Sequence, residues 1–277
     1  MQSSRRARPI VALGLCALIA SLLVIRPADA QQAPPGLVAA GKLTYGTAAT
    51  FAPFEYQEHG KLVGFDMEFG AAIAKAMGLE PNVVNMDFNG LIPALQGKRI
   101  DIINSAMYIN PKRETQVDFI PYMRIGEELV VRKGNPKNIH SRADLCGKTA
   151  SVTLGAIEDV YAREDAKKCE EEGKPTVTVL TLPTAQDAAL AVRSGRADVY
   201  YDSTPGATKA VTALPDVYQI AGPQFAEKTE IGIGVRKGDT AMKQAIERAV
   251  QAVVNDGTYA ALLQKYHLPA SGSLFNK

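Results

Sequence analysis

The chain has 277 residues, a formal net charge of +2 and a hydrophobic fraction of 46%. These values are typical of a globular protein and sufficient for one large domain or two smaller ones. The near-neutral charge, with no basic run inside the chain, argues against nucleic acid as a partner. Beyond the amino-terminal segment, no stretch is long and apolar enough to predict a membrane span.

The first 30 residues have the three parts of a secretory signal peptide. A cationic segment, MQSSRRARP, precedes the apolar run IVALGLCALIASLLVI, and small residues follow at Ala28 and Ala30. Signal peptidase requires small residues at two such positions, so we predict a signal peptide over 1–30, cleaved after Ala30, and export to the periplasm. Residues 31–40 would then form a flexible leader.

Export leaves two cysteines in the chain, Cys146 and Cys169. In an oxidising compartment an even pair predicts one disulfide. It would close a loop of roughly 20 residues and contribute about 3 kcal/mol in the chain-entropy model. Two buried thiols are the alternative.

Strand and helix patterns alternate along the mature chain. A strand is predicted over 41–48, followed by a hairpin that turns at His59-Gly60. Next comes a helix, which we expect to be opened by Asp66 and ended by Gly78. Its apolar stripe has a spacing of four and consists of Phe65, Phe69, Ile73 and Met77. The continuing alternation predicts an α/β fold with parallel sheet and flanking helices.

Two pairs of segments are similar between the halves of the chain. ALQGKRIDIIN (94–104) and LAVRSGRADVYYD (190–202) share a helix end at Gly, a basic residue, then Asp and an apolar strand; VVRKGN and GVRKGD are a second pair. The repeats predict two similar lobes joined by paired crossings. We expect lobe 1 over 41–122 and 232–277, lobe 2 over 128–226, and hinge segments over 123–127 and 227–231.

Candidate binding residues follow from the strand ends, because ligands of open α/β sheets bind beyond the carboxyl ends of strands. In lobe 1 one strand ends at Ser105, just before Tyr108 and Arg113, and in lobe 2 the matching strand ends at Asp202. Asn110 and Pro111 predict a helix start. Arg113 would then lie in the first helical turn, where a cation is unfavourable unless an anion binds it. A solvated surface charge is the alternative.

A second helix start lies in lobe 2, after Gly155, and its first free amides belong to Ala156 and Ile157. Such a terminus can bind an anion. Together with Arg113 it would hold a carboxylate, while Asp202 would receive an ammonium, a pattern that fits an α-amino acid. The alternative for Asp202 is an N-cap of the turn 203–205. We expect Glu158 and Asp159 to complement the helix dipole and to make no contact with a ligand.

The sequence gives little indication of an enzyme. The three histidines have no cysteine or carboxylate at metal-ligand spacing, and no G-x-S-x-G, S-x-x-K set or glycine-rich phosphate loop is found. We therefore expect no catalytic activity, no metal and no cofactor.

Five stretches together resemble one family. These are GFDMEFGAAIAKAM (64–77), GTAATFAPFEY, FNGLIPALQGKRIDII, INPKRETQVDF and NDGTYAALLQKY. In this combination they resemble the family 3 extracytoplasmic solute-binding proteins, the polar amino-acid receptors of bacterial ABC importers, over nearly all of the mature chain. The resemblance implies the type II two-lobed periplasmic-binding-protein fold with a two-segment hinge.

The same resemblance implies roles for individual residues. Phe51 would stack on the ligand and Phe88 would line the pocket. Ser105 would help to hold the amine, with Ala106 beside it. Arg113 would bind the α-carboxylate and Asp202 the α-ammonium.

This chain departs from the family pattern at several of these positions. Tyr108 replaces a usual Ser or Thr, and Ala156-Ile157 replaces a hydroxyl residue after the glycine, so backbone N–H groups must serve there. Ala48 stands where members that take basic amino acids often carry an acid, which disfavours a basic ligand. The aromatic side chains Phe51, Phe88 and Tyr108 could suit a ring or a compact cation. An ectoine-like cyclic zwitterion therefore remains an alternative to a neutral amino acid.

We thus expect a monomeric periplasmic receptor that closes on a small zwitterion and docks on an inner-membrane ABC permease. One alternative is a periplasmic dehydratase on the same fold, acting on cyclic acids resembling prephenate. Another is a sensor module that reports its ligand to a membrane kinase.

Overall fold

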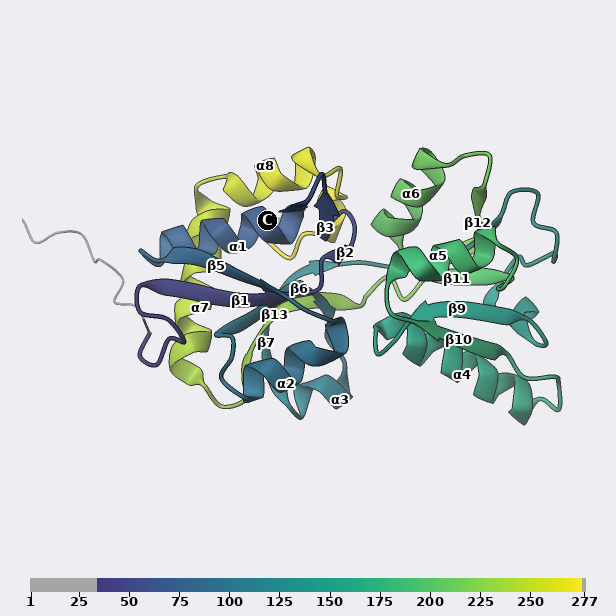
Figure 1. The fold of residues 1–277 in the computed structure, drawn as a ribbon, viewed down its shortest axis with the longest axis horizontal. Coiled ribbons are helices and arrows are strands. Elements are labelled where there is room, and N and C mark those ends of the chain that lie inside the picture. Colours follow the sequence, from purple (N-terminus) through teal and green to yellow (C-terminus); the bar gives the residue numbers. More distant parts are fainter. Residues whose placement is uncertain (1–33, 276–277) are drawn as a thin grey trace, which may run out of the picture. The chain divides into compact units, whose positions relative to one another are not determined.

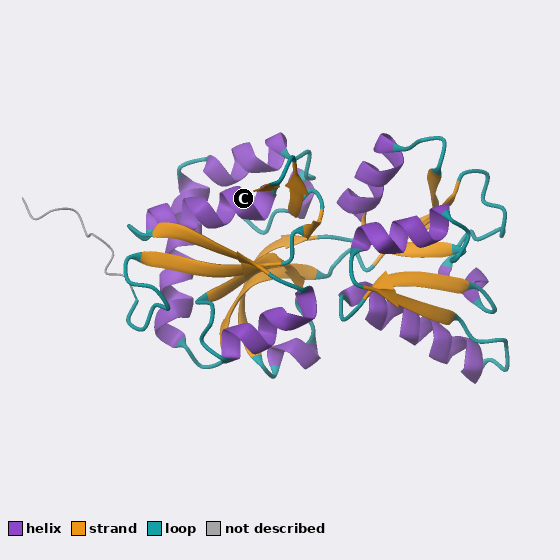
Figure 2. Cartoon of the chain, in the orientation of Figure 1, coloured by secondary structure: helices purple, strands orange, loops and turns teal. Residues whose placement is uncertain are grey.

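Two five-stranded sheets organise residues 34–275, which are the residues that the computed structural model describes. Helices cover both faces of each sheet (Figure 1, Figure 2). The predicted signal peptide lies outside the described residues. None of the helices between residues 34 and 275 has the length and apolar character that a membrane span needs.

The first sheet combines segments from both ends of the chain. Its strands, in spatial order, are β5 (Glu80–Asn85), β1 (Lys42–Thr47), β6 (Ile102–Tyr108), β13 (Glu230–Arg236) and β7 (Val117–Arg124). Its helices are α1 (Phe65–Ala76), α2 (Leu91–Gln96), α3 (Pro111–Glu114), α7 (Thr240–Asn255) and α8 (Thr258–Lys265). β1 is parallel to β5 and β6, whereas β13 is antiparallel to β6 and β7.

Alternate residues of β6 separate the two faces of this sheet. Ile102 packs in the core that includes α1 and α7, whereas Ile103 and Met107 pack against Leu91 and Leu95 of α2. This period of two is the ordinary geometry of a strand that is buried on both sides.

The second sheet comes from the middle of the chain. Its strands, in spatial order, are β10 (Thr178–Leu182), β9 (Thr149–Thr153), β11 (Val199–Ser203), β8 (Glu127–Arg132) and β12 (Tyr218–Phe225). Its helices are α4 (Ile157–Glu171), α5 (Ala185–Arg193) and α6 (Thr204–Ala213). In β8, Leu129 and Val131 pack on the side of α4, and Val130 packs with residues of α5 and α6.

The chain passes between the two sheets twice. It leaves the first sheet after β7 and enters the second at β8, through residues 125–126; it returns between β12 and β13, through residues 226–229. Both passages overlap the crossings predicted from the repeats. Hinge movement at these segments remains a prediction.

Two local predictions, the hairpin turn at His59-Gly60 and the Asn110 helix cap, are confirmed. A small third sheet is formed by β2 (Thr50–Phe51), β3 (Glu55–Glu58) and β4 (Lys61–Val63), and its hairpin turns at His59-Gly60 with φ of 49° and 75°. Two consecutive positive φ angles are typical of a type I′ hairpin turn.

Asn110 caps α3 as predicted, because its Oδ1 accepts a hydrogen bond of 2.9 Å from the Arg113 amide. Short 3₁₀ turns occur at Phe88–Gly90, Arg142–Leu145 and Ala270–Gly272.

The prediction that Asp66 opens the first long helix is wrong. α1 begins at Phe65 after Gly64, and Asp66 makes no capping bond. Its side chain is instead buried, accepting hydrogen bonds from the Ala106 amide at 2.6 Å and from the Tyr122 hydroxyl at 2.8 and 3.0 Å. Asp66 therefore connects α1 to β6 and β7.

The structure contains the predicted disulfide between Cys146 and Cys169, which connects the loop before β9 to α4. We expect the double variant Cys146→Ser/Cys169→Ser to lose about 3 kcal/mol of unfolding free energy, because its unfolded chain is no longer restricted by the closed loop. Urea unfolding of both proteins measures the loss. Adding reductant should lower the stability of the wild type and leave the double variant unchanged; equal stabilities without reductant would contradict the prediction.

Candidate functional site

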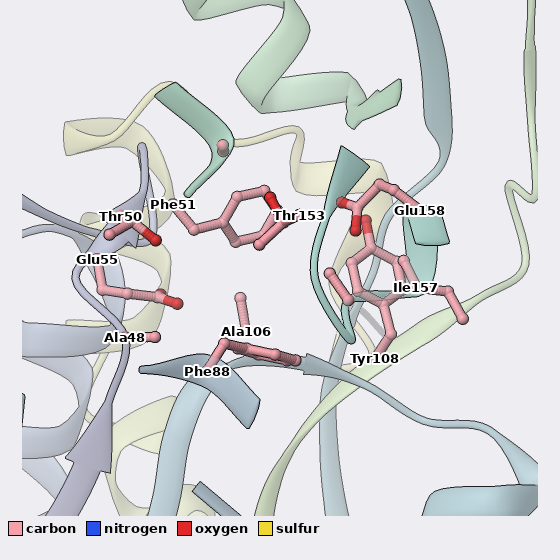
Figure 3. Close-up of a pocket in the computed structure, with 12 residues that line it drawn as sticks. Ala48, Thr50, Phe51, Glu55, Phe88, Ala106, Tyr108, Thr153, Ile157 and Glu158 are labelled. Atoms are coloured by element: carbon pink, nitrogen blue, oxygen red, sulfur yellow. The ribbon is translucent and has the colours of Figure 1, made fainter. Parts of the chain in front are cut away.

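A cavity that is partly open to solvent is lined by residues associated with both sheets. One wall consists of Ala48, Thr50, Phe51, Glu55, Phe88, Ala106 and Tyr108. The other wall consists of Thr153, Ala156, Ile157, Glu158 and Ala185. The close-up shows the Phe51 and Phe88 rings on the side of the first wall and Glu158 directed into the space from the second (Figure 3).

Six of the nine predicted site residues line this cavity, and three do not. The lining six are Phe51, Phe88, Ala106, Tyr108, Ala156 and Ile157. The other three, Ser105, Arg113 and Asp202, are buried close to it. Ser105 hydrogen-bonds to Glu55 and Arg113 to Tyr108, and the charge of Glu158 raises the pKa of Asp202.

Arg113 does not line the cavity, but it contacts residues at both of its walls. Its guanidinium donates to the Tyr108 carbonyl at 2.6 Å and to the Gly155 carbonyl at 3.0 Å, and it lies over the Phe88 ring at 5.2 Å. Burial lowers the pKa of Arg113 to about 10, and the charge of Glu158 opposes that shift. The side chain is therefore still a cation at neutral pH, and it joins α3 to the turn that precedes α4.

Ser105 positions the residues of the first wall. Its hydroxyl accepts a hydrogen bond of 3.0 Å from the Ala48 amide and donates one of 2.8 Å to Glu55 Oε1. Glu55 is fully buried, and its pKa is raised well above the ordinary value by burial and by the charge of Asp66. The carboxyl group of Glu55 thus borders the cavity with its neutral form favoured.

Ala106 has a strained backbone at the cavity wall. Its φ is 34°, a left-handed value that is uncommon for a residue other than glycine. The 2.6 Å bond from its amide to Asp66 Oδ2 holds this conformation. Strain of this kind persists only where surrounding contacts fix it, and it often occurs at binding sites.

Asp202 neither lines the cavity nor caps the following helix. The N-cap of α6 is Ser203, whose Oγ accepts a 3.1 Å hydrogen bond from the Gly206 amide. Asp202 is buried, its Oδ1 has no hydrogen-bond partner among residues 34–275, and burial together with the charge of Glu158 raises its pKa. The capping alternative considered for Asp202 is therefore wrong.

Two buried acids were not among the predicted site residues: Glu158, which lines the cavity, and Glu127, which lies next to the lining residue Tyr108. Glu158 was expected only to complement the helix dipole, but it lines the cavity, and burial is the main cause that raises its pKa to about 7. Asp159, in contrast, forms a local ion pair with Arg163 at 2.8 Å. Glu158 directly follows Ala156 and Ile157 in the sequence, and this position next to the predicted anion site could have indicated that Glu158 lies near the ligand. Glu127 gave no comparable signal, because its burial depends on tertiary packing.

Metal binding receives no support from the described part of the chain. No three His, Cys, Asp or Glu side chains between residues 34 and 275 are arranged so that they could hold a metal ion.

Residues 43–269 match the family described as bacterial extracellular solute-binding proteins, family 3. The chain belongs to this family. One family relative is the L-cystine-binding protein TcyJ of Escherichia coli K12, which is 31% identical over 229 residues, covering 82% of each protein.

Solved structures agree with the family and with its two-lobed type II fold. An ancestral arginine-binding protein bound to arginine has a TM-score of 0.76 and 36% identity, covering 82% of this chain and 98% of its own. An ancestral amino acid-binding protein, described as a precursor of cyclohexadienyl dehydratase, has a TM-score of 0.71 and 32% identity, covering 82% of this chain and 95% of its own.

The raised pKa of Glu158 predicts a pH dependence of stability. Because its folded-state pKa of about 7 exceeds the ordinary 4.5, its contribution is fully present below pH 4.5 and is lost as the pH rises through 7. We expect the unfolding free energy of the ligand-free protein to fall between pH 5 and 8. Glu158→Gln should reduce that fall by an amount on the order of 2 kcal/mol.

Urea unfolding at several pH values between 5 and 8 tests this prediction. Glu170→Gln is a matched control, since Glu170 is an exposed residue of the same helix. The control should keep the wild-type pH dependence. An unchanged pH dependence in Glu158→Gln would show that Glu158 is ionised normally.

Proposed function

We propose that the protein is the receptor of a bacterial ABC importer and that it binds an amino acid in the cavity between the two sheets. The observation that carries the proposal is the position of one buried cation, Arg113, beside a cavity whose opposite wall contains the start of α4 and the acid Glu158. A ligand with a carboxylate and an ammonium complements these two features. Family membership supports the same reading.

The carboxylate would bind at the Arg113 end of the cavity. At present the guanidinium donates to the Gly155 carbonyl, immediately before the lining residue Ala156. A carboxylate is a stronger acceptor than a carbonyl and can bind a guanidinium through two parallel hydrogen bonds. It would replace the Gly155 carbonyl and also accept from the amides of Ala156 and Ile157 at the start of α4.

The remaining predicted residues have supporting roles in this proposal. Phe51 and Phe88 would pack on the ligand from the first wall, Ser105 and Ala106 would hold that wall in place, and Tyr108 would narrow the cavity. Asp202 would act on the ammonium from behind the second wall.

We further infer the cellular context from the signal sequence and the family. The chain is exported, cleaved after Ala30, and acts in the periplasm as a monomer that delivers its ligand to an inner-membrane permease. Ligand would favour the closed form, because its two charged groups bind on different lobes. The passages at 125–126 and 226–229 are where the chain would bend.

Replacing Arg113 tests the site directly. We expect Arg113→Ala to lose measurable binding of the amino acid that stabilises the wild type, because the carboxylate then has no cation. Lys112→Ala is the matched control, since Lys112 is the exposed neighbour in α3. Binding within a few-fold of wild type in Arg113→Ala would contradict the carboxylate assignment.

The measurement is a thermal-shift panel of amino acids, ectoine, betaines and opines on protein stripped of ligand by unfolding and refolding. A ligand at about one hundred times its dissociation constant adds roughly 2.7 kcal/mol to the unfolding free energy. Ectoine as the sole stabiliser would favour the cyclic-zwitterion alternative over an ordinary amino acid.

A dehydratase on the same fold is the second candidate function. The observation that favours it is Glu158, a cavity-lining acid whose raised pKa would suit a general acid. If the receptor proposal is correct, incubation with prephenate or arogenate should yield no product above the level of Glu158→Gln. Turnover that this substitution removes would establish the enzyme instead.

A further inference from the structure

A cation–π contact joins the two lobes outside the ligand cavity. The Nζ of Lys209, in α6, lies 3.6 Å from the centroid of the Tyr56 ring, in β3. Tyr56 is half-buried, whereas Lys209 is exposed. None of the ion pairs among residues 34–275 includes Lys209, so the Tyr56 ring is the partner that the structure gives to its charge.

Each residue of this pair is fixed to its own lobe. Tyr56 follows Phe54, which is buried in the core of the first sheet and whose carbonyl accepts a 2.8 Å hydrogen bond from the Asp66 amide of α1. Lys209 follows Ala207, which is buried in the core of the second sheet. Because β3 and α6 are anchored separately, a hinge movement that separates the lobes also separates Lys209 from Tyr56.

The pair lies in a groove that is distinct from the ligand cavity. The groove is lined by residues that include Pro53, Tyr56 and Val63 from one lobe and Pro205, Thr208 and Lys209 from α6, and no residue between 34 and 275 lines both the groove and the cavity. Glu55 and Tyr56 are neighbours in β3, and neighbouring side chains of a strand point to opposite faces. Glu55 accordingly lines the cavity and Tyr56 the groove. The pair therefore acts on binding only through the position of the lobes.

We propose that Tyr56 and Lys209 form an interlobe latch, a pair of positioning residues that stabilises the closed form and thereby raises the affinity for the ligand. This inference rests on the proposed function, because it needs a receptor that opens and closes around its ligand. Opening would leave the Lys209 ammonium in water and the Tyr56 ring without its cation. The contact therefore favours the closed form, and stabilising the form that holds the ligand strengthens binding. Affinity for every ligand changes by the same factor, because the pair distinguishes lobe positions and not ligands.

Removing either partner tests the latch on ligand-stripped protein. Lys209→Gln removes the charge, and Tyr56→Leu removes the ring. The probes are the amino acids of the thermal-shift panel, and titration calorimetry gives the dissociation constant of each one that binds the wild type. From the usual strength of a cation–π contact at an exposed site, we expect each variant to bind about two- to fivefold more weakly. Wherever two probes bind, the factor should be the same for both.

Lys265→Gln and Lys209→Arg are the matched controls. Lys265 lines the same groove, but its partners, Glu68 at 2.6 Å and the Tyr266 ring at 5.5 Å, belong to the same lobe as Lys265 itself. Lys265→Gln removes a positive charge from the groove without removing a contact between lobes, so binding should stay at the wild-type level. Lys209→Arg should also bind as the wild type does, because a guanidinium can replace the ammonium over the ring.

The double variant Lys209→Gln/Tyr56→Leu distinguishes a direct pair from two independent effects. Once one partner is gone, removing the other breaks no further interlobe contact, so the double variant should bind about as tightly as either single variant. Thermal unfolding without ligand shows whether each variant is folded. Should Tyr56→Leu fail to fold, Lys209→Gln and its rescue by Lys209→Arg still decide the proposal, because Lys209 is exposed.

The possible failures are distinguishable. Wild-type affinity in Lys209→Gln, or an equal loss in Lys265→Gln, would overturn the latch while leaving the amino-acid receptor intact. A loss that differs between probes would also overturn it, because Lys209 would then act on the ligand and not on the lobes. Binding of no amino acid by the wild type would contradict the proposed function itself.

Discussion

The buried carboxylate of Asp66 is the contact on which the first wall of the site depends. It accepts hydrogen bonds from the Ala106 amide and the Tyr122 hydroxyl, while the backbone carbonyl of Asp66 accepts one from Asn104. One residue of α1 thus fixes β6, β7 and the left-handed conformation of Ala106. Removing the carboxylate would leave these buried donors unpaired, which costs more than the hydrogen bonds contribute when they form. These contacts hold the Ala106 part of the cavity wall to the buried core.

Burial of charge gives the two walls different properties. On the first wall, Glu55 is held by Ser105 and lies near Asp66, so its acidity is suppressed and its role is to support the wall. On the second wall, Glu158 is buried with its Oε2 unpaired, and burial is the main cause that raises its pKa to about 7, so its neutral form is favoured below that pH.

Local patterns predicted local structure well. The His59-Gly60 turn, the Asn110 cap and the disulfide of Cys146 with Cys169 are all found in the structure, because each depends on few residues close together in the chain or on an even count of cysteines. Asp66 was misjudged because Asp before an apolar stripe is a usual capping pattern. Here tertiary contacts gave its carboxylate better partners, and the helix begins at Gly64 and Phe65 instead.

The sequence by itself determined the α/β class, the two similar halves and the family, since periodicity, turn residues and five family motifs are read along the chain. It also placed six residues on the cavity wall: Phe51 and Phe88 were predicted from the family resemblance, and Ile157 from a helix start, which is a local feature. Only the tertiary structure decided the charge of the site. Whether Glu158 faces solvent or the cavity, and whether Glu127 is buried beside it, depends on the packing of α4 against β8 and β11. The burial that this packing imposes is what raises the pKa of an acid that would be ionised on a solvated surface.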